Sequence, residues 1–513
     1  MLKRSRALAS VAVIAVIAGM SAPAWADTLQ EALALAYRTN PTLLAQRANQ
    51  RALDESIVQA RAGLRPQVDV SANANYFASQ TGSGEREVDT NNDGVPDTTI
   101  NIPESNDDGT SGGVSVGVSQ SIWSGGRIGH GITAAEANIY AGRENLRDIE
   151  QTVLASVIQA YADVLRDSEI LTIRQSNLGV LRRQLDESSA RFEVGEITRT
   201  DVAQSEARLA QSEADLANAQ AQLSVSRAVY AAVVGQAPGD LAPMPGLPGI
   251  PTDFDTALDV ANLDNPRIRA AGYNLQAAEA NVAAAKAEYL PSARLTASYG
   301  GSTDDLGRAG DIFDNRTFQA GASLSVPLFT GGLVSSRVAQ ARERANVAQI
   351  SIEGERRSTL QAVSSAYAQA ISARSTLQAG EQSVRAATVA AEGVRQEAQV
   401  GLRTTLDVLN QELELRNAEV LLAGARRNEY VAQANLLAAM GRLEGQDLDP
   451  SLDVYDPAAN YQRIRNRGAL PWDGVLETID RIAAPAVVPA EDAPDAPIDR
   501  QLKSEIIRTA PGN

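Results

Sequence analysis

The sequence predicts an α+β fold that is mostly α-helical, in which long antiparallel coiled-coil helices are joined to four β-strands per chain. Three observations predict it: the chain repeats one unit twice, four segments alternate between apolar and polar residues, and two long stretches carry heptad patterns. Both copies have the same order: a helical start, a strand, a loop, a strand, a very long helix, a glycine break and a second helix.

Residues 1–26 have the pattern of a secretory signal peptide. Basic residues open the segment, an apolar run covers residues 8–20, and Ala24-Trp25-Ala26 matches the small-residue cleavage motif. We therefore expect the mature chain to start at Asp27 and to be exported.

The composition excludes some partners. The chain has 63 acidic and 46 basic residues and a net charge of −17, which argues against nucleic acid as a partner. It contains no cysteine, so disulfides contribute nothing to its stability in an oxidising compartment.

Two copies of one unit fill most of the chain. Trp123-Ser124-Gly125-Gly126 in the first copy matches Phe329-Thr330-Gly331-Gly332 in the second, and Ala160-Tyr161-Ala162 matches Ala366-Tyr367-Ala368 at the same spacing. We place the first repeat at 27–237, a Pro- and Gly-rich linker at 238–251, the second repeat at 252–445, and a polar, partly disordered tail at 446–513.

The four predicted strands are typical of a membrane β-barrel. Apolar and polar side chains alternate over about ten residues in each strand, as expected for one lipid-facing and one lumen-facing side. Aromatic residues near the strand ends, where interfacial girdles lie, are Tyr76, Phe77, Trp123, Tyr299 and Phe329. The strands are expected at about 66–77, 113–123, 291–300 and 317–329, with a loop insertion at 78–112; the alternative is the edge of a soluble β-sandwich.

Four strands cannot close a barrel by themselves. An open sheet in lipid would leave two edges of unpaired backbone groups, which a bilayer does not tolerate. Several chains must therefore share one barrel, although this argument does not give their number.

Long helices follow the strands. Arg127 to Phe192 and Leu333 to Val400 contain no proline, and each would be about 100 Å long as a helix. The shorter helices carry heptads, with small residues in the second seam of the first copy. An ordinary soluble coiled coil is the alternative. The seams are Val202, Leu209, Leu216, Leu223 and Tyr230, then Ser205, Ser212, Ala219, Ser226 and Val233, and in the second copy Val408, Leu415, Leu422 and Leu436.

These residues give the chain a resemblance to the TolC-type outer-membrane factor family, over nearly all of the mature sequence up to about Gly445. The twofold repeat carries it, together with Leu64-Arg65-Pro66, Trp123 to Gly126, Gly195 to Val202 and Gly401 to Val408. The resemblance implies a homotrimer with a twelve-stranded transmembrane β-barrel and a trimeric α-barrel. It further implies an outer-membrane location with a long periplasmic portion, a periplasmic adaptor and an inner-membrane ABC or other export transporter, and it is closest to the type I secretion subgroup.

The resemblance also implies a periplasmic gate at the glycine breaks, Gly195 and Gly401. By position, Asp201 and Arg403 match a gate-holding acid and base, and Asp407 matches an acidic ring. Asn410 stands where the family often has a second acid.

A structural alternative for these acids stays open. Thr198 with Asp201 and Thr404 with Asp407 have the spacing of capping boxes, and the cap and gate roles can coexist. If three Asp407 carboxylates converge in a trimer, repulsion should raise their apparent pKa and attract cations.

The insertion contains a candidate calcium loop. Asp89, Asn91, Asp93 and Asp97 place oxygen side chains around a glycine turn, which suits calcium. Ile100 occupies the position where an EF-hand has glutamate, so an acidic surface loop is the alternative. No other cofactor is expected.

An enzymatic function is not expected. Gly113-Val114-Ser115-Val116-Gly117 fits the G-x-S-x-G motif, but it lies inside a predicted strand, and His130 is the only histidine. The sequence therefore predicts a passive outer-membrane exit duct for exported protein, small molecules or both, with a periplasmic coiled-coil adaptor or scaffold as the alternative.

Overall fold

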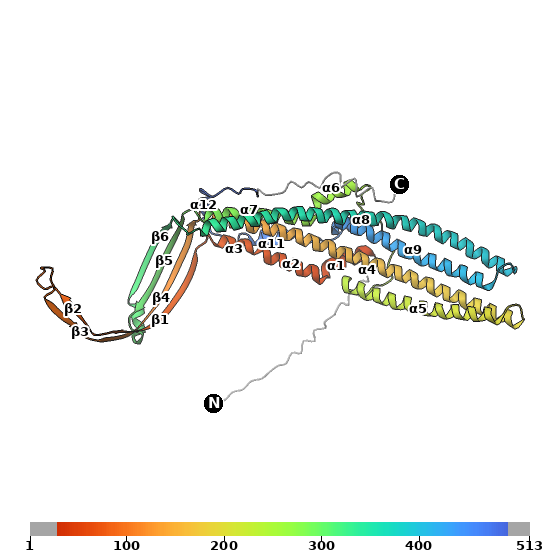
Figure 1. Ribbon diagram of the computed structural model, residues 1–513, viewed down its shortest axis with the longest axis horizontal. Helices are drawn as coiled ribbons and strands as arrows, with labels where there is room; N and C mark the ends of the chain where they lie inside the picture. The colour runs from red at the N-terminus through yellow and green to blue at the C-terminus, as the bar shows by residue number, and fades with distance from the viewer. Residues whose placement is uncertain (1–27, 491–513) are drawn as a thin grey trace, which may run out of the picture.

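The computed structural model describes residues 28–490, with a β-sheet at one end and long helices extending from it (Figure 1). The predicted signal peptide lies outside the described residues. The first half contains α1 (Leu29–Thr39), α2 (Pro41–Asp54), α3 (Ser56–Ala62), β1 (Gln67–Thr81), β2 (Gly84–Val88), β3 (Thr98–Ile102), β4 (Ser105–Trp123), α4 (Arg127–Glu193) and α5 (Arg199–Val234). The second half contains α6 (Phe254–Asp264), α7 (Pro266–Ala287), β5 (Ser292–Thr303), the 3₁₀ helix η1 (Leu306–Phe313), β6 (Arg316–Ser325), α8 (Leu333–Gln399) and α9 (Thr405–Met440), followed by α10 (Gly445–Leu448), α11 (Pro457–Ile464) and α12 (Asp473–Asp480).

The main sheet has four antiparallel strands in the order β1-β4-β5-β6. Its register brings apolar residues opposite one another, with Val68 facing Val118 and Val70 facing Val116. Val68 is 67% exposed and Val70 is 70% exposed, so this apolar face is uncovered in the single chain. The outer edges of β1 and β6 pair with no other strand of the described chain.

The expected loop at 78–112 is wrong in detail, because strands occupy much of it. β1 continues to Thr81, β4 begins at Ser105, and β2 pairs with β3 in a separate hairpin that extends beyond the sheet (Figure 1). The antiparallel register of β1 and β4 simply continues past Tyr76, where it pairs with Thr110. The fourth strand ends at Ser325 instead of 329, since Pro327 has no N–H to donate to a ladder.

Two aromatic residues near the strand ends lie on opposite faces of the sheet, one by alternation and one through a bulge. Phe77 pairs with Gly109 on the polar face, where the absence of a Cβ at Gly109 leaves room for the ring. A bulge between Ser121 and Trp123 turns Trp123 to the apolar face, opposite Ala293. Phe77 therefore lies on the polar face of the sheet, and its place in an interfacial girdle stays a prediction.

The long helices are confirmed, and the two halves have matching lengths. α4 and α8 have 67 residues each, and α5 and α9 have 36 residues each. On α9 the heptad residues are buried, whereas on α5 the small seam of Ser205, Ser212 and Ser226 is more deeply buried than the apolar seam near the tip. No helix within residues 28–490 has both the length and the apolar character needed to cross a bilayer.

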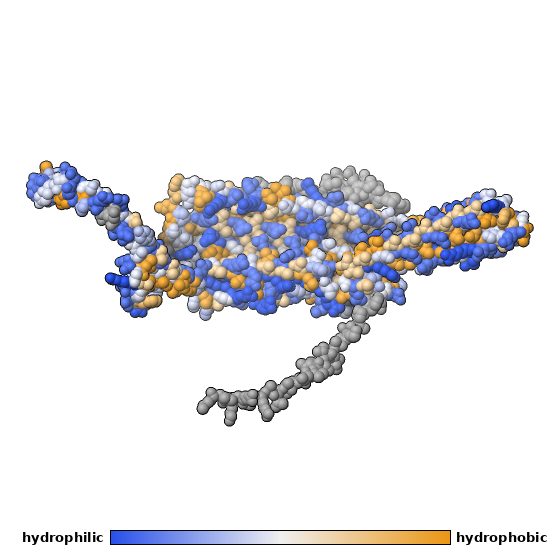
Figure 2. Space-filling view, turned by 90° about the horizontal axis from the view of Figure 1, so that it is seen from below, coloured by the Kyte–Doolittle hydropathy of each residue, from blue (hydrophilic) through white to orange (hydrophobic). Residues whose placement is uncertain are grey.

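The largest apolar core lies at mid-height, where α1, α4, α5 and α9 meet. Tyr161 of α4 and Tyr230 of α5 are fully buried there, with ring centroids 6.3 Å apart, and Tyr430 of α9 joins them. Away from this core the helices narrow to a slender end with exposed apolar residues (Figure 2), including Val194, Val389 and Leu402. Burial within one chain is thus concentrated in the middle of the molecule.

The tail is more ordered than its composition suggests. In this tail α11 packs against α2, and α12 packs against β4 and α4 at the joint between sheet and helices; Ile464, Leu476 and Asp480 are buried. Asp480 accepts hydrogen bonds from the N–H and hydroxyl of Ser124, at 2.6 and 2.7 Å, and from the N–H of Gly129 at 3.0 Å. The expectation of disorder in residues 491–513 lies outside the described residues.

Candidate functional site

The tips of the two helical hairpins, α4–α5 and α8–α9, form the candidate site. Gly195 and Gly401 have φ angles of +80° and +79°, which favour glycine because a Cβ would be strained there. The N–H of Glu196 donates to the carbonyl of Arg191 at 2.9 Å, and the N–H of Leu402 donates to that of Glu397 at 2.9 Å. These contacts close each long helix with the same left-handed turn.

Both capping boxes form at the tips. The N–H of Thr198 donates to Asp201 Oδ2 at 2.9 Å, and the N–H of Thr404 donates to Asp407 Oδ2 at 3.0 Å. Hydrogen bonds from the backbone and side chain of Thr198 lower the pKa of Asp201, and those of Thr404 lower the pKa of Asp407. In the single chain, both acids therefore stabilise the first turn of a helix as carboxylates.

Arg403 is held by its own hairpin. Its Nε lies 2.7 Å from Glu397 Oε2, and this hydrogen bond raises the pKa of Arg403. No hydrogen bond or ion pair joins Arg403 to Asp201 within residues 28–490. A link between Asp201 and Arg403 of neighbouring chains stays a prediction.

Asn410 contacts the other hairpin. Its Oδ1 accepts a hydrogen bond of 3.1 Å from an Nη of Arg208, which joins α9 to α5. Sequence reasoning missed Arg208, because the two residues are 202 positions apart and no local pattern connects them.

Glu412 is a second residue that sequence reasoning missed. It is only 2% exposed and contacts Arg395 of α8 and Arg416 of α9. An acid four residues after the buried seam residue Val408 is the signal that could have found it, since positions i and i+4 share a helix face.

The insertion loop uses its acids to shape the turn. Asp89 accepts from the backbone N–H groups of Asn92 and Gly94 at 2.6 and 2.7 Å, and Asp97 accepts from Thr90 at 2.9 Å. Asn91 and Asp93 likewise accept backbone bonds at 2.9 Å. Within residues 28–490 no three His, Cys, Asp or Glu side chains come together in a way that could hold a metal. Calcium binding by this loop stays a prediction.

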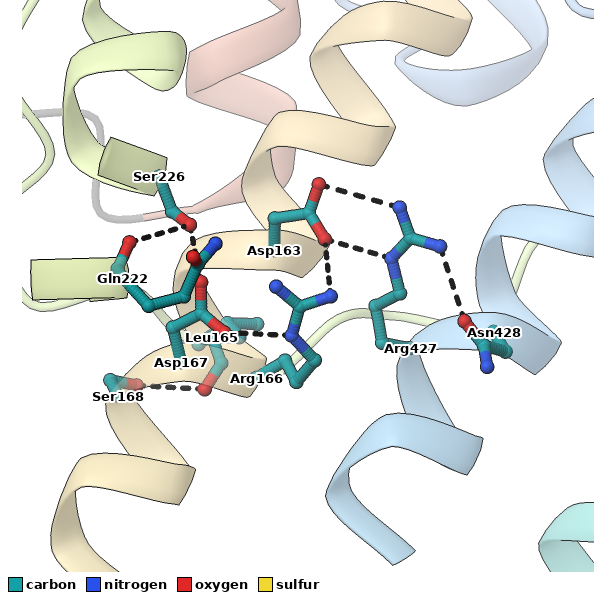
Figure 3. A network of polar contacts seen from close by, with 9 residues as sticks. All are labelled: Asp163, Leu165, Arg166, Asp167, Ser168, Gln222, Ser226, Arg427 and Asn428. Carbon is teal, nitrogen blue, oxygen red and sulfur yellow. Dashed lines mark hydrogen bonds and ion pairs between the residues drawn. The ribbon is translucent and has the colours of Figure 1, made fainter. Parts of the chain in front are cut away.

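A polar network joins α4, α5 and α9 beside the apolar core (Figure 3). Arg427 of α9 contacts both carboxylate oxygens of Asp163 on α4, at 2.8 and 3.3 Å. On the other side of α4, the buried Asp167 accepts from Ser226 of α5 and from Arg166. α4 is thus bonded to the helix on each side of it.

Known proteins share this architecture. Residues 32–236 and 257–442 match the family model of the outer membrane efflux proteins. The chain is 33% identical over 452 residues to the outer membrane efflux protein BepC of Brucella suis, covering 88% of this chain and 92% of that protein. It is 26% identical over 445 residues to the outer membrane protein TolC of Escherichia coli, covering 84% and 86% of the two chains.

Solved structures share the fold. The outer membrane protein VceC of Vibrio cholerae superposes with a TM-score of 0.64 at 22% identity, covering 80% of this chain and 96% of that one. Together with the two matched segments and the BepC relationship, this confirms the resemblance seen in the sequence. The chain belongs to the outer membrane efflux protein family.

Proposed function

We propose that this chain is the passive exit duct of a tripartite export system, gated at its periplasmic helical tips. One observation carries the proposal: a sheet with two open edges and an uncovered apolar face continues directly into helices of 67 residues. Helices of that length span about 100 Å. The molecule therefore combines a surface suited to face a membrane with long coiled-coil helices.

The chain is an outer-membrane protein with a long periplasmic portion, and its family is one of transport ducts, not of enzymes. We infer that three chains assemble, so that β6 of one chain pairs with β1 of the next and twelve strands close the barrel. Open edges in lipid would leave backbone groups unsatisfied, which supports assembly. The matched lengths of α4 with α8 and of α5 with α9 support an internal twofold repeat, in which each chain supplies two similar helical hairpins.

The proposed gate lies at the turns of Gly195 and Gly401. Asp201 of one chain and Arg403 of its neighbour hold the tips together, and Asp407 lines the pore. Convergence of three Asp407 side chains would oppose the effect of Thr404, because like charges raise the pKa while the cap lowers it.

Partners supply the energy and the cargo. A periplasmic adaptor and an inner-membrane ABC or other export transporter would complete the system, with outer-membrane lipid around the barrel. The cargo class follows the family: small molecules by efflux, and exported protein if the resemblance to the type I secretion subgroup holds. The family assignment favours this duct over the adaptor or scaffold alternative.

Single-channel conductance in a planar bilayer tests the proposal. We expect small, cation-selective openings from the wild type and larger openings from Arg403→Ala and Asp201→Ala, since either change breaks the proposed link between chains. Glu397→Ala is the matched control, because it removes only the contact within one hairpin and should behave like the wild type. No conductance from any of these proteins in a folded preparation would contradict the duct.

Calcium binding by the insertion loop has a separate test. Isothermal titration of the whole protein with calcium should release heat, and Asp89→Ala together with Asp93→Ala should abolish it, since carboxylates are the preferred calcium ligands. Titration of the wild type without heat would leave the loop as a turn stabilised by the backbone hydrogen bonds to Asp89, Asn91, Asp93 and Asp97.

A further inference from the structure

A cavity of about 350 Å³ lies at the joint between sheet and helices, on the polar face of the sheet. The register places Gln67 of β1 opposite Ser119 of β4 in its wall. It places Arg294 of β5 opposite Ser121 of β4 in the same wall. Arg127, the first residue of α4, lines the cavity from the helical side. Two arginines on different elements therefore share one cavity.

The charges of Arg127 and Arg294 are not neutralised. Both side chains are exposed, and neither makes a hydrogen bond or an ion pair in the part of the chain that the structure describes. This is unexpected in a chain with 63 acidic and 46 basic residues, where carboxylates are in excess. Arg65 also lines the cavity, but Asp473 holds it, with Oδ2 2.9 Å from its Nε. The two unpaired cations therefore favour an anion between them.

The matching joint in the second half of the chain is closed by an ion pair. Counted from the starts of β1 and β5, Gly63 matches Glu288. Counted from the starts of α4 and α8, Gly131 matches Arg337. Arg337 Nη1 lies 2.7 Å from Glu288 Oε2. The two glycines line the cavity instead, and a Cβ at Gly131 would have no atom within 4 Å, so this space stays open.

The two arginines are also particular to the first joint. By the same counting, Arg127 matches Leu333 at the start of α8, and Arg294 matches Asp69 of β1. Both joints connect a strand to a helix of 67 residues, so a purely structural role would require similar residues in both. An open cavity with two unpaired cations at one joint alone indicates a binding role there.

We propose that this cavity binds a soluble phosphate-bearing anion. Arg127 and Arg294 donate charge-assisted hydrogen bonds from two elements, and phosphate has enough acceptor oxygens to take both. Ser119 and Ser121 add hydroxyl donors, which have no other partner among residues 28–490. In the proposed duct the polar face lines the passage and is turned away from lipid, so the ligand arrives in solution; this point alone rests on the proposed function.

Isothermal titration of the whole protein in detergent with inorganic phosphate, at low ionic strength, tests the site. Arg127→Gln and Arg294→Gln should each weaken binding about ten-fold, because each removes charge-assisted hydrogen bonds. Gly131→Glu should abolish binding, since its carboxylate would occupy the cavity and pair with the arginines. The fold should tolerate this change, because the space beside Gly131 is open. Gly131→Gln has the same size without the charge and should bind phosphate more tightly than Gly131→Glu.

Arg337→Gln is the matched control. It removes an arginine from the other joint, where Glu288 already neutralises it, and should bind phosphate like the wild type. Equal phosphate affinities for the wild type, Arg127→Gln and Arg294→Gln would overturn the site. Heat from phosphatidylglycerol micelles without heat from phosphate would overturn a soluble ligand. Because titration needs no current, a protein that conducts without binding phosphate overturns the site alone, and one that binds phosphate but never conducts overturns the duct alone.

Discussion

Asp480 shows how much one side chain contributes at the joint between sheet and helices. It is fully buried and accepts three hydrogen bonds from Ser124 and Gly129, at the start of α4. Asp480→Ala would leave buried N–H groups unsatisfied, and we expect it to cost about 3 kcal/mol. Thermal unfolding of the purified protein in detergent measures this loss as a lower midpoint.

Glu477→Ala is the control for Asp480→Ala on the same short helix. Glu477 pairs with Arg481 on the surface, at 3.2 Å, and such exposed pairs contribute about 0.5 kcal/mol or less. Equal midpoints for the two variants would contradict the capping role of Asp480.

Single residues were the least predictable part of this molecule. The tail around Asp480 is polar and rich in proline, so its composition predicted no buried contact, and the buried carboxylate depends on a partner more than 350 positions away. Phe77 follows the alternation of the strand onto the polar face, but that its ring lies against Gly109 is known only from the register. The contact of Arg208 with Asn410 has no local signal either.

At the level of elements, the two capping boxes predict a response to acid. The pKa values of Asp201 and Asp407 are lowered by the backbone and side-chain bonds to Thr198 and Thr404. A depressed pKa adds stability that is fully present above the unfolded value, about 3.9, and is lost as the pH falls through the folded value. The first turns of α5 and α9 should therefore fray below about pH 4.

Hydrogen exchange measures this fraying as protection factors at neutral and acidic pH. Asp407→Asn removes the titrating group from α9, so protection of its first turn should stop changing with pH below 4. The first turn of α5 should still respond through Asp201, which makes it the internal control. Equal pH responses in the two helices of this variant would contradict the capping explanation.

Elements were the most predictable part. The proline-free stretches and the glycine breaks predicted the bounds of α4 and α8 to within one residue at each end. They did so because helix propensity and heptad pattern favour the same helix over many turns. The hairpin of β2 and β3 was missed, since its strands are short, exposed and polar, so neither burial nor alternation marks them.

For the whole molecule, the two faces of the sheet predict opposite responses to charge. Val70→Lys would place a cation on the apolar face of β1, at a cost of about 2–4 kcal/mol near the bilayer centre. Ser71→Lys, one residue along the same strand, points to the polar face and should be tolerated. Membrane insertion, followed as heat-modifiable protein in outer-membrane fractions, should fall for the first variant alone.

Equal insertion of the two lysine variants would contradict a lipid-facing side of the sheet. The alternation that defines this side was visible in the sequence, because the pleat has a period of two residues. The number of chains in the barrel could not be predicted from the sequence, because unpaired strand edges require partner strands but do not fix how many.

The β2–β3 hairpin stands apart from every other strand, pairing only with itself. Residues added at its turn, near Gly94, change no register in the four-stranded sheet and disturb no buried contact. The hairpin extends beyond the sheet on the side opposite the helices, which in an outer-membrane duct is the outside of the cell (Figure 1). A peptide epitope inserted there would be displayed to antibodies on intact cells, so the protein can serve as a carrier for surface display.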